Sequence, residues 1–171
     1  MKPTLTPNFF AIKNNLEDSG MIRRYFSCYG QYASRYDSLK AGVVLNAFDP
    51  TLSNGAMVDI GVYTIYPMVV LFGRPKKISA VGIKLSTGVD GQGAVNFEYE
   101  EMDATILYSK IADSFLPTEI QGEEGTIVSD RINIINEVTL KKRGGDEVLI
   151  SKPNLLHEYY FEVAEFIDLI E

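Results

Sequence analysis

The sequence predicts an α+β domain in which an open, largely antiparallel sheet has helices packed on one face. Its second half carries many short segments of alternating apolar and polar residues separated by glycine-rich turns, while helical periodicity recurs in few places. The chain has 171 residues, of which 46% are hydrophobic and 23% are charged. This is enough for one well-formed core, so we expect residues 1–171 to form a single domain.

The first helix is predicted to begin at Thr6, a favourable N-cap residue, with Pro7 at its first position. Apolar residues then recur at helical spacing up to Gly20, which ends the segment. From Ile22 to Ala33 the pattern changes to a long, aromatic-rich strand. Residues 34–50 are polar and are predicted to be mostly irregular.

A second helix is predicted between Asn54, a candidate N-cap, and Gly73. Pro67 lies inside it and should bend it or divide it in two, because proline cannot donate the helical hydrogen bond. Strands joined by tight turns follow. They are predicted over residues 77–85, 95–99, 104–109, 118–121, 126–129, 137–141 and 147–150.

The last predicted element is a helix that begins near Asn154. Three acidic residues, Glu158, Glu162 and Glu165, lie on one side of it. Its other side is apolar and is formed by Leu156, Tyr159, Tyr160, Val163, Phe166, Ile167 and Ile170.

Composition argues against several classes of function. The net charge of −7 disfavours nucleic acid as a partner, because phosphate binding needs clustered Lys and Arg. The apolar stretch over residues 55–72 is interrupted by Asp59, Gly61 and Pro67, which disfavours a membrane span. The chain has one cysteine, Cys28, and one histidine, too few for a structural zinc site. The lone cysteine fits a cytoplasmic protein, which is the location we expect.

The glycine-rich turns do not predict a nucleotide site. Residues 88–93 contain three glycines, but their spacing differs from G-x-G-x-x-G and strands are predicted on both sides. Residues 122–125 are also flanked by strands, and no Walker-type lysine follows either turn. Both segments are therefore predicted to be hairpin turns.

Asp59 and Tyr63 are the candidate functional pair. They are four residues apart, so on a helix they share one face. A carboxylate in an apolar helix must be hydrogen-bonded, paired or open to water, and Arg35 or Arg74 could be a purely structural partner. Alternatively, the carboxylate accepts hydrogen bonds from substrate hydroxyls while the phenol exchanges a proton. Gly61, which lies between them, indicates that another group approaches closely.

The segment Asn54–Tyr63 resembles the C-terminal domain of the Gfo/Idh/MocA family of NAD(P)-dependent oxidoreductases, because Asp59-Ile60-Gly61-Val62-Tyr63 is similar to the family's D-x-G-x-(H/Y) motif. The end of the helix, Leu71-Phe72-Gly73-Arg74-Pro75, is similar to the family pattern as well. Residues 122–127 resemble its G-x-x-G-x-(I/L) hairpin. The resemblance covers essentially the whole chain.

The resemblance implies that a Rossmann domain precedes this chain and that the substrate binds between the two domains. It assigns Asp59 to orient substrate hydroxyls and Tyr63 to act as the catalytic acid/base, as in the dihydrodiol and xylose dehydrogenase branch. A phenol ordinarily ionises at about pH 10, so it needs a nearby positive charge to work at neutral pH. The family supplies that charge from an E-K-P motif, which this chain lacks. The nucleotide fingerprint is lacking too, so we expect the chain alone to bind neither NAD nor NADP and to be inactive.

We therefore expect an intact NAD(P)-dependent sugar or dihydrodiol dehydrogenase. Candidate substrate contacts are the polar residues of the loop after the first strand, namely Arg35, Tyr36, Asp37 and Lys40. Tyr25 and Tyr29 lie on the opposite strand face from Phe26 and Cys28, so both faces of the sheet are apolar. Helices cover only one of them, which predicts a homodimer or tetramer formed through the open sheet face. The alternative is a non-catalytic ligand-binding or oligomerisation module, in which Asp59 and Tyr63 would be buried and paired.

Overall fold

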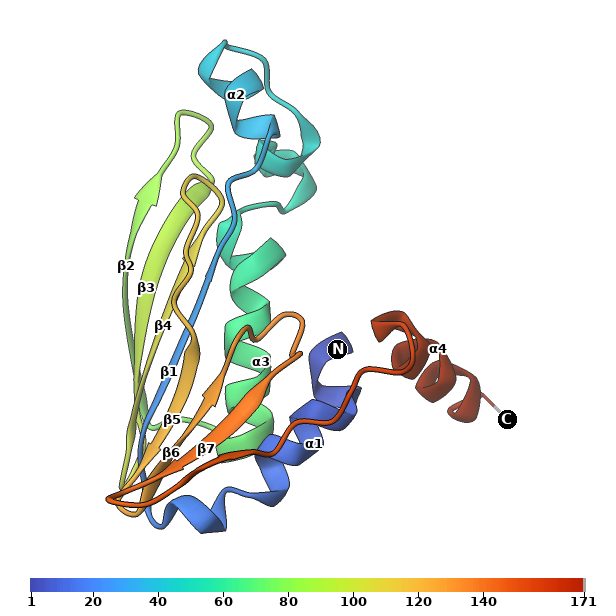
Figure 1. The fold of residues 1–171 in the computed structure, drawn as a ribbon. Coiled ribbons are helices and arrows are strands. Elements are labelled where there is room, and N and C mark those ends of the chain that lie inside the picture. The colour runs from blue at the N-terminus through green and yellow to red at the C-terminus, as the bar shows by residue number, and fades with distance from the viewer. Residues whose placement is uncertain (171) are drawn as a thin grey trace.

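The computed structural model describes residues 1–170 (Figure 1); residue 171, the last of the predicted domain, lies outside them. The α-helices are α1 (Pro7–Asn14), α2 (Arg35–Lys40), α3 (Val62–Phe72) and α4 (Glu158–Asp168). Short 3-10 turns are η1 (Lys2–Leu5), η2 (Glu17–Ser19), η3 (Asn46–Phe48) and η4 (Pro50–Leu52), and η5 (Met57–Gly61) is a π turn. The strands are β1 (Ile22–Gly30), β2 (Lys77–Lys84), β3 (Asp90–Glu98), β4 (Asp103–Ser109), β5 (Thr118–Gly122), β6 (Gly125–Ser129), β7 (Val138–Lys142) and β8 (Glu147–Leu149).

The strands form one open sheet in the order β2-β3-β4-β1-β5-β6-β7-β8. Neighbouring strands are antiparallel except β1 and β4, which run parallel with Tyr25 opposite Ala104. Helices α1 and α3 lie on one side of this sheet (Figure 1). The fold class predicted from the sequence, an α+β domain with a largely antiparallel open sheet, is confirmed.

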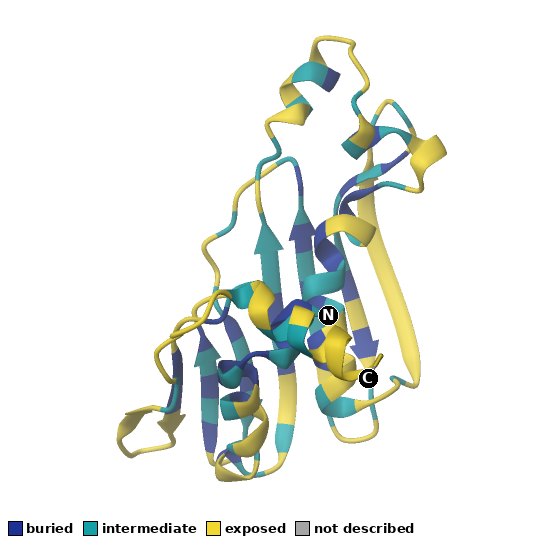
Figure 2. Ribbon diagram, turned by 90° about the vertical axis from the view of Figure 1, so that its right-hand side faces the viewer, coloured by how far each residue is buried: buried dark blue, intermediate teal, exposed yellow. Residues whose placement is uncertain are grey.

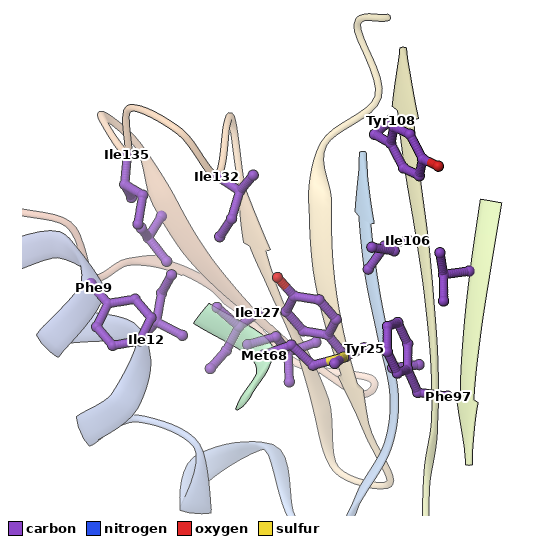
Figure 3. Packing of buried hydrophobic residues seen from close by; sticks show 14 of the residues in the cluster. Phe9, Ile12, Tyr25, Met68, Phe97, Ile106, Tyr108, Ile127, Ile132 and Ile135 are labelled. Atoms are coloured by element: carbon purple, nitrogen blue, oxygen red, sulfur yellow. The ribbon is translucent and has the colours of Figure 1, made fainter. Parts of the chain in front are cut away.

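The core lies between the sheet and these two helices. Figure 3 shows Tyr25 of β1 and Ile106 of β4 facing Met68 of α3, and all three side chains are fully buried. Phe9 and Ile12 of α1 close the other end of the same cluster. The strand alternation explains this arrangement, because every second side chain of a strand faces the helices. Figure 2 shows that β2, at the edge of the sheet, is exposed along its length.

The first helix begins as predicted, with Pro7 at its first position and the Thr6 hydroxyl accepting a hydrogen bond from the Phe9 amide. Several boundaries differ from prediction. The first helix ends at Asn14 rather than near Gly20, strand β1 ends at Gly30 rather than Ala33, and the last helix begins at Glu158 rather than near Asn154. Helix α2 forms inside the segment predicted to be mostly irregular. The predicted turn over 88–93 is shorter as well. Gly93 belongs to β3, where a side chain would have its Cβ 2.3 Å from the Tyr108 hydroxyl.

Pro67 does not divide α3, which is continuous from Val62 to Phe72. The irregularity lies one turn earlier, in the π turn η5. By length and composition alone, Pro50–Phe72 is apolar enough to cross a membrane. Core helices of globular proteins meet the same length and composition criteria. Here Thr64 and Met68, which belong to α3, are fully buried.

Candidate functional site

The π turn η5 and the start of α3 position the two candidate residues, Asp59 and Tyr63. The predicted N-cap is wrong: the carboxylate of Asp90, on β3, accepts the hydrogen bond from the Met57 amide at 2.8 Å. The side-chain amide of Asn54 instead donates a hydrogen bond to the backbone carbonyl of Asn46. π turns are frequent at functional sites because they shift a helix face locally.

The structure explains why two positions of the motif are glycine. A Cβ at Gly55 would lie 2.2 Å from Oδ1 of Asp90, so glycine lets the capping carboxylate reach the helix. A Cβ at Gly61 would lie 3.3 Å from the Tyr108 ring and 3.0 Å from the Met57 sulfur. The close approach predicted at Gly61 therefore comes from the sheet beneath the helix.

Asp59 is paired with Lys110 rather than with Arg35 or Arg74. The Lys110 side chain is only 5% exposed, whereas that of Asp59 is 52% exposed. The Lys110 ammonium also lies 5.2 Å from the ring centroid of Phe48. A buried cation thus fixes the inner side of the Asp59 carboxylate, and its outer side remains open to water.

Sequence reasoning missed Lys110, although a signal existed. Ala104, Ile106 and Tyr108 of β4 are buried in strict alternation, and Lys110 continues the same phase one residue beyond the strand. An inward-facing lysine needs a buried anion. Asp59 was the one carboxylate that the sequence placed in an apolar helix.

Tyr63 lines a cleft of about 530 Å³. Its ring meets that of Tyr29 edge to face, with 5.8 Å between the centroids. Lys2 Nζ lies 5.9 Å from the Tyr63 centroid and forms a 2.8 Å ion pair with Glu158. Other lining residues include Gln31, Asp113, Asp130, Arg131, Asn133 and Tyr159. Lys2 is therefore a cation beside Tyr63 that the sequence did not reveal.

The electrostatics of Tyr29 link the two candidate residues. Burial raises the pKa of Tyr29, and the neighbouring Tyr63 and Asp59 raise it further. Arg131 and a hydrogen bond with Asn133 act in the opposite direction. Asp59 and Tyr63 thus lie close to one phenol at the cleft wall. Both candidate residues are only partly buried, and neither is sealed in the core.

The four predicted loop contacts lie elsewhere, on α2, which stands at one end of the molecule (Figure 1). Lys40 pairs with Asp37 at 2.7 Å, and both bond the Tyr32 hydroxyl. Their pairing raises the pKa of Lys40 and lowers that of Asp37. Tyr36 packs on Phe48, the ring that covers Lys110, and Arg35 is exposed. None of these four residues lines the Tyr63 cleft.

The two glycine-rich turns are hairpin connections, as predicted. Each glycine-rich turn joins two strands, so neither turn aims a helix N-terminus at a pyrophosphate. Within residues 1–170, no group of three or more His, Cys, Asp or Glu side chains is placed to hold a metal ion. A carboxylate and a phenol are groups that can bind hydroxyls and exchange protons.

The open α+β sheet, with a carboxylate and a phenol four residues apart, fits the C-terminal domain of the oxidoreductase family that the sequence resembles. Residues 18–128 match the GFO/IDH/MocA C-terminal domain. The chain belongs to this family. It is 48% identical over its whole length to the scyllo-inositol 2-dehydrogenase (NADP(+)) IolU of Bacillus subtilis (strain 168), covering 52% of that protein.

A second relative is the uncharacterized oxidoreductase YgjR of Escherichia coli (strain K12), 35% identical over 99% of this chain and 52% of its own length. The fold matches the crystal structure of aldose-aldose oxidoreductase from Caulobacter crescentus complexed with glycerol, with a TM-score of 0.80. That match covers 99% of this chain and 52% of the other at 13% identity, and shows the fold alone. The chain therefore spans about half the length of the curated relatives it matches.

Proposed function

We propose that this chain is the substrate-binding and dimerisation half of an NAD(P)-dependent dehydrogenase that oxidises a CH–OH group of a sugar, cyclic polyol or dihydrodiol. The single observation that carries the proposal is the arrangement around Tyr29: Tyr63 packs on it and lines a polar cleft, and Asp59, anchored by a buried lysine four residues before Tyr63, lies near enough to act on the same phenol. The 48% identity to an inositol dehydrogenase favours a cyclic polyol within this class, and NADP as the cofactor.

The proposed roles follow from the geometry. The exposed side of the Asp59 carboxylate accepts hydrogen bonds from two neighbouring hydroxyls, while Lys110 keeps its other oxygen fixed. Tyr63 exchanges a proton with the oxygen of the reacting carbon, and the Lys2 ammonium lies 5.9 Å from the centroid of its ring. Arg35, Tyr36, Asp37 and Lys40 remain candidates for contacts at the outer end of the substrate. The cofactor would be held by the half of the relatives that this chain does not span, and it supplies hydride transfer when bound.

The test measures turnover of the intact protein with a panel of inositols, sugars and dihydrodiols. Turnover is monitored through the reduction of NAD or NADP. The Tyr63→Phe variant should lose turnover while it keeps polyol binding, because only the proton-exchanging hydroxyl is removed. Tyr66→Phe is the matched control, since Tyr66 lies on the same helix, is 43% exposed and is outside the cleft. Unchanged turnover in Tyr63→Phe would refute the assignment.

We also propose that the isolated chain binds neither cofactor and is inactive. The observation behind this is that both glycine-rich turns join strands. Titration of the chain with NADH and NADPH, followed by cofactor fluorescence, measures binding directly. Micromolar affinity for either would contradict the proposal and favour a complete enzyme.

We propose further that the open sheet face forms a homodimer, or a tetramer built from such dimers. Val81, Ala94, Leu107 and Cys28 align across β2, β3, β4 and β1 and line an apolar groove of about 430 Å³. Val81 is 73% exposed, which is unusual for a strand residue with apolar neighbours. The Val81→Lys variant should shift the mass measured by light scattering towards the monomer. A wild-type monomer at high concentration would contradict the idea.

The remaining proposals concern the cellular setting. A cytoplasmic location is supported by the single cysteine, Cys28, which has no partner for an internal disulfide. The net charge of −7 supports the absence of nucleic-acid and membrane partners. Cell fractionation tests the location, and recovery in the membrane or periplasmic fraction would refute it.

A further inference from the structure

Helix α4 contacts the rest of the chain through two ion pairs and through Phe161, which lines a pocket with Lys2 and Pro3. Glu158 pairs with Lys2 at 2.8 Å, and Glu162 lies 3.7 Å from the amino group of Met1. Both contacts are made with η1 and the residue before it, at the very start of the chain. No residue between 158 and 168 is buried.

The apolar side of α4 faces outwards. Phe166 is 64% exposed and Val163 is 55% exposed. The other exposed members of this face, which we call the outer face, are Tyr160, Ile167 and Ile170. An 11-residue helix is marginal by itself and normally becomes stable by packing its apolar face. The outer face therefore requires a cover that the described residues do not provide.

The open sheet face cannot bring a second copy to this helix. Figure 1 shows α4 beyond α1, on the helix side of the molecule and away from the sheet. Anionic partners are disfavoured as well. Residues 158–168 contain four carboxylates and neither Lys nor Arg, so α4 would be repelled by phosphate backbones and anionic lipid surfaces.

The position of α4 indicates what covers it. The helix contacts residues 1–5, and the chain matches a C-terminal domain whose curated relatives are about twice as long. In a protein built like these relatives, the part that precedes a C-terminal domain connects on the side of η1, which α4 contacts. We propose that the outer face of α4 docks on the preceding nucleotide-binding half, so that the last helix fastens the two halves together. This inference rests on the function proposed above.

Such docking would also fix the position of residues that line the Tyr63 cleft. Lys2, Glu158 and Tyr159 line the cleft together with Tyr63, and Lys2 Nζ lies 4.9 Å from the Tyr159 ring centroid. Both ends of the Lys2–Glu158 pair belong to segments at the proposed junction. Docking of α4 on the nucleotide-binding half would therefore hold the Lys2 ammonium in place beside Tyr63.

Hydrogen exchange read by mass spectrometry tests the docking. The amides of residues 158–168 are compared between this 171-residue chain and the intact protein. We expect exchange in the intact protein to be slower by about tenfold or more, because docking suppresses local opening. Phe166→Ser in the intact protein should restore fast exchange in α4. Glu165→Gln, an exposed change next to it, should leave the slow exchange unchanged.

Turnover with a cyclic polyol is measured on the same intact samples and reports the proposed function separately. Active protein whose α4 exchanges as fast as in the isolated chain would overturn the docking and leave the function standing. Slow exchange that survives Phe166→Ser would overturn it too. Protection that grows with the concentration of the isolated chain would assign the outer face to a second copy instead. An intact protein no longer than this chain would overturn both proposals.

Discussion

Removing Asp59 should destabilise the fold more than removing Lys110, the residue it pairs with. The reason is their unequal burial, since the Lys110 side chain is 5% exposed and that of Asp59 is 52% exposed. Asp59→Ala leaves an ammonium group in the interior with no anion. Lys110→Met leaves a carboxylate that water already reaches, and the methionine can still pack on Phe48.

The magnitudes follow from this asymmetry. Loss of one partner of a buried ion pair costs about 3–5 kcal/mol when the remaining charge stays buried. We expect about 3 kcal/mol for Asp59→Ala, the lower end of that range, because the pair is exposed on one side. For Lys110→Met we expect about 1 kcal/mol, as for an exposed pair. The double variant should resemble Lys110→Met alone, since no buried charge is then left unpaired.

Urea unfolding of the 171-residue chain, followed by circular dichroism because the chain has no tryptophan, gives these free energies. Leu52→Ala, a change at an exposed side chain, is the control for a neutral substitution. Equal losses of unfolding free energy in the two single variants would refute the reasoning. So would a double variant as unstable as Asp59→Ala, because the buried ammonium would then not be the source of the cost.

Three further predictions concern the framework around the site. Asn8 is fully buried, and its side chain both donates to and accepts from the backbone of Lys152. Asn8→Ala should therefore lower the free energy of unfolding by about 2–3 kcal/mol in the urea assay. Asn14→Ala, a change at an exposed residue, should alter it little. Burial, and then the charge of Asp90, raises the pKa of Tyr108 to about 12. The unfolded chain therefore releases that proton first, and the free energy of unfolding should fall as the pH rises from about 10 towards 12, a fall that Tyr108→Phe should reduce. Gly93→Ala should lower the melting temperature measured by circular dichroism, because its Cβ would lie 2.3 Å from the Tyr108 hydroxyl and overpacking costs about 1–3 kcal/mol; an unchanged melting temperature would show that the ring moves freely.

Local patterns predicted most of the fold. The alternation over residues 104–109 placed β4 within one residue of its ends, and that over residues 95–99 found the second half of β3, because strand side chains face opposite sides in turn. Helix α2 was not predicted. Its six residues are too few for helical periodicity, and Tyr36 is held there by Phe48, which comes later in the chain.

The N-cap of the second helix was assigned to the wrong residue for a related reason. Asn54 has the right chemistry and the right position in the sequence. The group that caps Met57 is the carboxylate of Asp90, 33 residues further along the chain. Sequence spacing cannot reveal such a cap, because it depends on how β3 pairs within the sheet.

By itself the sequence determined the fold class and the order of strands along the chain, and it singled out Asp59 and Tyr63 as the candidate pair. Each of these follows from residues within one or two turns of one another, where periodicity fixes which side chains share a face. Only the tertiary structure gave the partners of that pair, Lys110 for Asp59 and Lys2 beside Tyr63. It also turned the apolar side of α4 away from the core. These contacts join segments far apart in the chain, and sheet order and helix packing decide which segments meet.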